Sequence, residues 1–131
     1  MPRSESSGCE RCWPADSEAT WRARGALELV AELIDESHFH VRLLGCPGCG
    51  QRFVSVFTEE IDWADGEDPQ AWSLLPLTPE EANGLAAAGR NLSEAGLDAL
   101  GAGRRCLRRE LAKGEAPRVY WSRGLSVGPH D

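Results

Sequence analysis

Residues 38–63 read HFHVRLLGCPGCGQRFVSVFTEEIDW and hold a Cys-x-x-Cys pair, Cys46 and Cys49, between the apolar-rich runs HFHVRLL and QRFVSVFT. In the second run, apolar side chains alternate between two faces, a pattern typical of a β-strand. The two runs therefore predict an antiparallel hairpin with the cysteines at its turn. At that turn we expect Gly48 and Gly50 to adopt the positive φ that points backbone N–H groups at the cysteine sulfurs.

A second pair with the same spacing, CERC, lies near the N-terminus. One Cys-x-x-Cys pair supplies two thiolates, and a tetrahedral zinc site needs four ligands. The sequence therefore predicts one structural Zn²⁺ held by Cys9, Cys12, Cys46 and Cys49. Because four thiolates leave no position for water, this metal is expected to be structural and not catalytic.

These two knuckles resemble those of zinc-ribbon proteins, in which two Cys-x-x-Cys turns on small β-elements share one structural zinc. The resemblance covers residues 9–58 and implies an α+β fold: a zinc-ribbon-like antiparallel hairpin or small sheet with flanking helices. The chain departs from compact ribbons because 33 residues separate Cys12 from Cys46, which indicates an inserted element. The run HFHxxLLxCxxCGQ with the later EEIDWxDGxDPQ is also similar to a group of uncharacterised bacterial proteins, and this similarity implies no function.

Other interpretations of these cysteines and histidines stay open. His38 and His40 alternate along the predicted strand, and they are lesser metal ligands that could replace the N-terminal cysteine pair. Cys46 and Cys49 could instead be the dithiol of an oxidoreductase, although a redox pair usually opens a helix. The fifth cysteine, Cys106, is expected to be a small core residue.

The whole chain has 131 residues, which favours a single domain, and five cysteines, which suit a reduced compartment with metal. Its formal charge is −7, which opposes binding to phosphate backbones. Neither a signal peptide nor a run of about 18 apolar residues is present, so we expect a cytoplasmic protein without a membrane segment.

Along the chain, residues 1–8 are polar and expected to be disordered, and residues 9–78 form the β core with an inserted helix at 16–34. An alternative is a strand over 26–34, with a turn at 35–37, that would add a third strand to the hairpin. Residues 72–77 predict an edge strand.

The C-terminal part, residues 79–131, is expected to be helical. Thr78 to Glu81 carry a capping-box signature that predicts a helix up to about residue 89. A second helix is predicted over 93–113 from the spacing of its leucines, and residues 119–121 predict a last strand. On that second helix, Arg104, Arg105, Arg108 and Arg109 would form a basic patch.

An acidic stretch follows the hairpin and is called the acidic loop here (residues 59–68). Its carboxylates surround one indole and are expected to face a partner: Glu59, Glu60, Asp62, Trp63, Asp65, Glu67 and Asp68. The alternative is that Trp63 packs into the core and only the carboxylates of the loop face water.

No catalytic constellation is evident in the sequence, so we expect a zinc-binding protein that is not an enzyme. Its expected role is to bind a protein with a basic surface through the acidic loop, as an adaptor or an inhibitor. The first alternative is a nucleic-acid-binding zinc ribbon that acts through Arg11, Arg42, Arg52 and the arginines at 104–109. The second alternative is a Cys-x-x-Cys oxidoreductase.

Overall fold

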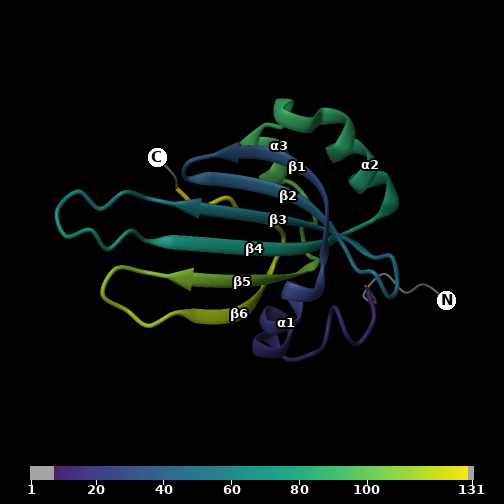
Figure 1. Cartoon of the computed structure of the whole chain (residues 1–131), viewed down its shortest axis with the longest axis horizontal. Coiled ribbons are helices and arrows are strands. Elements are labelled where there is room, and N and C mark those ends of the chain that lie inside the picture. The colour runs from purple at the N-terminus through teal and green to yellow at the C-terminus, as the bar shows by residue number, and fades with distance from the viewer. Residues whose placement is uncertain (1–7, 130–131) are drawn as a thin grey trace.

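The computed structural model describes residues 8–129, so the predicted disorder of residues 1–8 lies, apart from Gly8, outside the described residues. Its main feature is a six-stranded antiparallel sheet whose strands follow one another in chain order (Figure 1). The strands are β1 (Glu28–Glu36), β2 (Phe39–Gly45), β3 (Arg52–Glu59), β4 (Gln70–Leu77), β5 (Arg105–Leu111) and β6 (Arg118–Arg123). The helices are α1 (Ser17–Ala23), α2 (Pro79–Ala88) and α3 (Glu94–Asp98), with 3-10 turns η1 (Arg24–Ala26) and η2 (Gly89–Asn91). The fold is therefore mainly β with some helix, and the expectation of an α+β class holds only in this coarse sense.

The predicted central hairpin is present as β2 and β3. Every residue of β2 has a partner in β3. At the turn, the Cys46 N–H donates to the Gln51 carbonyl and the Gly50 N–H donates to the Cys46 carbonyl, each at 2.9 Å. Gly50 has a φ of +82°, as predicted, whereas Gly48 lies outside the left-handed region, so the expectation for Gly48 is wrong. One left-handed residue is sufficient to close this turn.

The sequence predicts a helix over residues 16–34, but only α1 is α-helical and the prediction is wrong for the residues after it. The chain leaves α1 at Ala23, passes through η1 and forms β1 from Glu28 onward, with the following turn at residues 37–38. The alternative interpretation, a third strand beside the hairpin, is correct. β1 gives the backbone groups on the second edge of β2 their partners, and this pairing across the turn at residues 37–38 outweighs the helix propensity of its Leu, Glu and Ala residues.

The helix predicted over residues 93–113 is also wrong, because only α3 is helical and the rest of the segment forms β5. Gly101 and Gly103 have φ values of +63° and +85°, which end the helical path. A β-carbon on Gly101 would lie 2.8 Å from a Leu75 methyl carbon, so this close approach requires glycine. Cys106 and Leu107 are both buried but on opposite faces of the sheet, as expected of neighbours in a strand.

The predicted edge strand over residues 72–77 is instead central, since β4 lies between β3 and β5. Its proline is nevertheless tolerated, because pairing with β5 ends at Leu74, before Pro76. The Pro76 carbonyl accepts a hydrogen bond from Arg104 Nη1 at 2.8 Å, so a side chain replaces the ladder there.

The capping box is confirmed. The Glu81 N–H donates to Thr78 Oγ1 at 3.1 Å, and the Thr78 N–H donates to Glu81 Oε1 at 2.9 Å. These two bonds satisfy donors that the first turn of α2 would leave unpaired. The predicted last strand is confirmed as β6.

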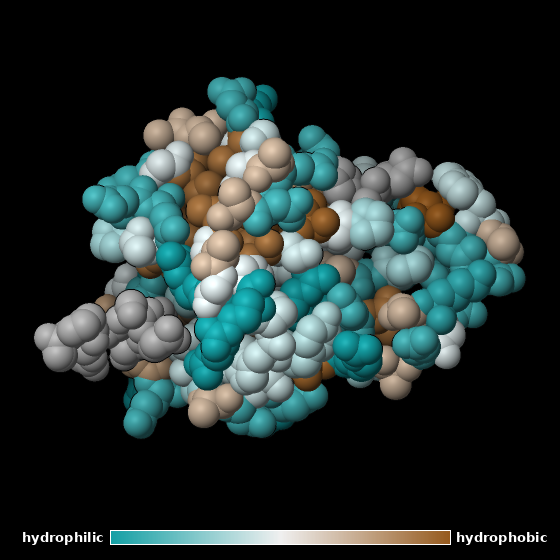
Figure 2. Space-filling model, turned by 180° about the vertical axis from the view of Figure 1, so that it is seen from behind, coloured by the Kyte–Doolittle hydropathy of each residue, from teal (hydrophilic) through white to brown (hydrophobic). Residues whose placement is uncertain are grey.

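Each face of the sheet carries its own hydrophobic cluster. On one face, residues of β1–β5 pack with α2, α3 and the segment that holds Leu125 and Val127. Figure 2 shows that apolar side chains gather in the upper part of the rear view, beside α2 and α3. On the other face, Trp13 and Cys12 from the N-terminal segment cover Phe53, Leu74 and Leu107. The chain segment before β1 is thus part of the core.

Candidate metal centre

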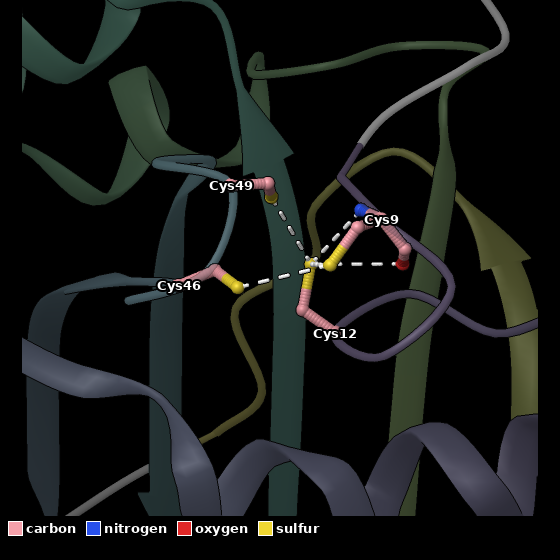
Figure 3. Close-up of side chains that lie close together, drawn as sticks. All are labelled: Cys9, Cys12, Cys46 and Cys49. Carbon is pink, nitrogen blue, oxygen red and sulfur yellow. Dashed lines mark hydrogen bonds between the residues drawn. The ribbon is translucent and has the colours of Figure 1, made fainter.

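The four predicted ligands come from two chain segments that the sheet brings together. Cys46 and Cys49 lie in the turn between β2 and β3, and Cys9 and Cys12 lie in a turn of the N-terminal segment. Figure 3 shows the two pairs facing each other, with the sulfur atoms meeting in the space between the segments. The Trp13 N–H donates to the Cys9 carbonyl at 2.9 Å, which closes the N-terminal turn as the predicted knuckle requires.

The distances between the sulfur atoms match those of a tetrahedral metal–thiolate site. Sγ–Sγ separations are 3.6 Å for Cys9 and Cys12, 3.9 Å for Cys9 and Cys46, and 3.8 Å for Cys12 and Cys49. Four sulfurs at about 2.3 Å from one zinc ion define a tetrahedron with edges of about 3.8 Å. All four sulfurs lie within 4.8 Å of one another. The cysteine cluster therefore fits a metal ion.

Aromatic packing and one glutamine hold the two knuckles in register, and the sequence interpretation had missed both. The Trp13 ring lies 5.4 Å from Phe53 and 5.1 Å from Trp121, which fixes the N-terminal segment on the sheet. Gln51 accepts a hydrogen bond from the Gly8 N–H at 3.0 Å and donates to the Leu77 carbonyl at 2.8 Å. A polar residue directly after a Cys-x-x-Cys-Gly turn is the signal that could have suggested this link.

The thiols differ in how readily they ionise. Backbone N–H groups of Cys12 and Arg11 lower the pKa of Cys9 to about 6. Burial raises the pKa of Cys12 and of Cys49 above the ordinary thiol value. Crowded thiols that resist joint ionisation release protons when a cation binds and favours their thiolates. Cys106 lies apart in the core, and burial raises its pKa to about 11, which agrees with a packing role.

The structure places the two lesser candidates, His38 and His40, at the far end of β2 from the cysteine turn. His38 Nδ1 lies 3.1 Å from Glu59 Oε1, and the His40 ring packs against Phe57 at 5.6 Å. Neither histidine belongs to the cysteine cluster.

The acidic loop lies at the opposite end of β3 from the metal centre (Figure 1). Its interior is organised by Asp62, whose carboxylate accepts hydrogen bonds from the N–H groups of Ala64, Asp65 and Glu67 at 3.1–3.3 Å. The Asp62 N–H in turn donates to Asp68 Oδ1 at 2.8 Å. These bonds build an ordered turn.

Lys113, from the connection between β5 and β6, ties the acidic loop to its neighbour. Its Nζ lies 3.0 Å from Asp62 and 2.7 Å from Asp65, and its hydrogen bond is the main cause that lowers the pKa of Asp62. Trp63 is 86% exposed, so the alternative that its ring packs into the core is wrong. Glu59, by contrast, is half-buried at the base of the loop and accepts a hydrogen bond from Gln70 at 2.8 Å.

The four arginines predicted as one helical patch are instead distributed around β5. Arg104 pairs with Glu81 at 2.8 Å, and Arg105 stacks on Trp121 with its guanidinium 3.9 Å from the ring centre. Arg108 is buried and pairs with Glu110 at 2.8 Å, while Arg109 lies 4.9 Å from the ring centre of Trp72. Neighbouring strand residues face opposite sides of a sheet, so these cations do not form one surface.

Neither known protein families, nor curated proteins, nor solved structures give a match to this chain. Within residues 8–129, no helix has the length and apolar character needed to cross a lipid bilayer. The resemblance to zinc ribbons therefore rests on the cysteine tetrad and its geometry.

Proposed function

We propose that this protein is a zinc-stapled, zinc-ribbon-like module, not an enzyme, that binds a partner protein with a basic surface through the acidic loop. The observation that carries the proposal is Trp63, whose side chain is 86% exposed on a loop that internal hydrogen bonds hold in shape. Exposing an indole to water costs free energy, and indoles are among the residues that dominate binding at protein interfaces.

The charge around Trp63 supports a basic partner. Exposed carboxylates of Glu60, Asp65 and Glu67 lie within four residues of Trp63 in the loop, and Lys113 pairs with the loop from the neighbouring connection. A partner with clustered Lys or Arg residues would relieve the repulsion among these carboxylates, which is screened over roughly 8 Å at physiological salt. Such complementarity mainly speeds association and selects the partner.

The metal has a separate task in this proposal. Zn²⁺ would join the N-terminal segment to the turn between β2 and β3, at the end of the sheet remote from the acidic loop. It would stabilise the scaffold without touching the partner. Of the arginines in the nucleic-acid alternative, Arg104, Arg105 and Arg108 each contact a partner within the chain, which favours the protein-binding function.

The test starts with a pull-down from the cells that make the protein, followed by binding kinetics with the partner. Trp63→Ala should weaken binding by about tenfold or more, as expected for an interface hot spot. Glu60→Lys combined with Glu67→Lys should slow association and remove its salt dependence, because both side chains are exposed. Asp65 is left unchanged, since it pairs with Lys113 and its reversal would disturb the loop itself. Asp68 is unsuitable for charge reversal, since its carboxylate accepts a hydrogen bond from the Asp62 N–H.

The matched control reverses two exposed carboxylates on β1, Glu28→Lys with Glu36→Lys, which changes the net charge equally. The association rate of this control variant should differ from that of the native protein by only a small factor. Partner binding that is indifferent to both loop variants, with zinc content and melting temperature unchanged, would place the interface elsewhere.

A further inference from the structure

A second group of metal-ligating side chains lies on the face of β1 and β2, far from the cysteines. Glu32, Asp35 and His40 bring one ligand atom each to within 4.8 Å of the others. Glu32 and Asp35 are three residues apart, and in a regular strand such residues face opposite sides of the sheet. The register of β1 shifts between Glu32 and Ile34, so that Glu32 pairs with Arg42 and Asp35 pairs with His40. This bulge places both carboxylates on the face that carries His40.

The bulge arises because two neighbouring side chains are buried, and it brings the three ligand atoms together as a consequence. Leu33 and Ile34 are both buried, at 5% and 8% exposure, although they are neighbours in a strand. Only an irregular strand can bury two adjacent side chains in one core, and both belong to the cluster beneath α2.

His40 shows why this group suits a cation and not simply an ion pair. Its Nδ1 atom is inaccessible to solvent and has no hydrogen-bond partner, although Asp35 Oδ1 lies 3.0 Å away. The two atoms are therefore close but not oriented as donor and acceptor. Two ligands at right angles, each about 2.1 Å from one ion, are about 3.0 Å apart. A buried polar atom without a partner is costly, and a bound ion would satisfy it.

The surroundings fix the other parts of the group. Phe57 packs against the His40 ring at 5.6 Å, and Arg42 Nε donates to both oxygens of Glu32 at 3.1 and 3.0 Å. A carboxylate has about four lone-pair sites, so Glu32 can bind Arg42 and a metal ion together. Arg42 would orient this ligand in the way that outer-shell partners do at metal sites.

We propose that Glu32, Asp35 and His40 form a second metal site, independent of the cysteine centre, for a divalent cation that prefers mixed nitrogen and oxygen ligands. Mn²⁺ and Zn²⁺ have this preference. One imidazole and two carboxylates leave three octahedral positions for water. The site borders solvent, since the Asp35 side chain is 67% exposed, so the ion exchanges readily.

The probe is Mn²⁺, because hard Mn²⁺ competes poorly for thiolates, added to protein whose cysteine centre is already loaded with zinc. Loss of the free-Mn²⁺ electron paramagnetic resonance signal should show one saturable site per chain. His40→Ala and Asp35→Asn should each raise the dissociation constant at least about tenfold. Glu36→Gln, an exposed carboxylate on the same strand outside the group, should leave it unchanged.

Mn²⁺ should also broaden the amide resonances of Asp35 and Val41 in the native protein, a readout that needs no variant. Absence of saturable binding overturns the proposal. Binding that survives both His40→Ala and Asp35→Asn with unchanged affinity also overturns it, and assigns the ion to another cluster such as the acidic loop. If His40→Ala fails to fold, the Mn²⁺ affinity of Asp35→Asn and the broadening of the Asp35 and Val41 amide resonances test the proposal. Asp35→Asn is expected to fold, because the Asp35 side chain is exposed and contributes little to the core.

Discussion

The sulfur atoms of Cys9 and Cys46 lie 3.9 Å apart although the two residues are 37 positions apart along the chain. Their approach depends on the packing of Trp13 against Phe53, which brings the N-terminal segment onto the sheet. Only one of the two hydrophobic clusters includes this segment. Loss of the metal is therefore expected to release the N-terminal segment before the cluster beneath α2 opens.

The first prediction concerns the cysteine ligands. The native protein should contain about one zinc per chain, and Cys49→Ser should lose the metal and lower the melting temperature. Binding free energy at a structural zinc site is on the order of 10 kcal/mol and is largely folding free energy. Elemental analysis and thermal unfolding measure both effects.

Cys106→Ser is the matched control because it removes a thiol from the core without touching the centre. It should keep its zinc and cost about 1–3 kcal/mol for burying a hydroxyl group. If Cys49→Ser retains the zinc content and melting temperature of the native protein, Cys49 is not a ligand.

The second prediction separates two glycines beside the centre. Gly8 has a φ of +68°, and a β-carbon there would lie 2.7 Å from Cys12 Sγ, so Gly8→Ala should displace the sulfur and speed zinc transfer to a chelator. Gly48→Ala should not, since its β-carbon would meet nothing closer than Cys46 Sγ at 3.7 Å. Left-handed backbone adds about 1–2 kcal/mol of strain for alanine at Gly8. Equal zinc-transfer rates for the two variants would contradict this prediction.

The third prediction concerns the metal-free protein. Cys9, whose pKa is about 6, should be mostly thiolate at pH 7 and should be the first thiol alkylated by iodoacetamide. Its reactivity should rise as the pH increases through about 6 and then level off. Cys106, with a pKa of about 11 and no exposed surface, should stay unmodified.

Peptide mapping by mass spectrometry at several pH values identifies the alkylated cysteine. Zinc should protect Cys9, because a thiolate bound to the metal is not free to attack. Faster alkylation of Cys49, which is the exposed thiol of the cluster, would show that exposure outweighs the hydrogen bonds at Cys9.

The fourth prediction concerns the start of α2. Burial opposes ionisation of Glu81, but hydrogen bonds from Arg104 and Thr78 outweigh it and lower its pKa below the ordinary value of a glutamate. A lowered folded-state pKa stabilises the protein above the unfolded-state value, and this contribution is lost as the pH falls through the folded-state value. Glu81→Gln should therefore cost about 1 kcal/mol at pH 7 and less under acidic conditions.

Urea unfolding of both proteins at pH 7 and in acid measures that difference. Glu80→Gln, in the same helical turn but exposed, serves as the control and should be nearly neutral. A cost for Glu81→Gln that stays constant with pH would show that the ion pair with Arg104 contributes nothing.

The sequence by itself determined the parts of this protein whose signals are local. Alternating side chains around CPGCG specified the hairpin of β2 and β3, and Thr78 with Glu81 specified the start of α2. The cysteine cluster that fits a metal ion also followed from the spacing of two Cys-x-x-Cys pairs, because a knuckle is complete within a few residues.

Only the tertiary structure decided the identity of β1 and β5. Their Leu, Glu, Ala and Arg residues favour helices, and their apolar positions fit a helical period as well as an alternating one. Pairing with the open edges of β2 and β4 satisfied backbone groups on those strands, and the residues of β1 and β5 taken alone do not reveal that energy.

The same limit applies to the surfaces that carry the proposed functions. The bulge that unites Glu32 and Asp35 on one face follows from burying Leu33 and Ile34 together, and the exposure of Trp63 follows from Asp62 closing the loop beneath it. The predicted helix would have placed the four arginines in one patch, but the segment forms a strand, so the arginines lie on both faces. Side-chain direction depends on secondary structure, and here long-range pairing chose the secondary structure.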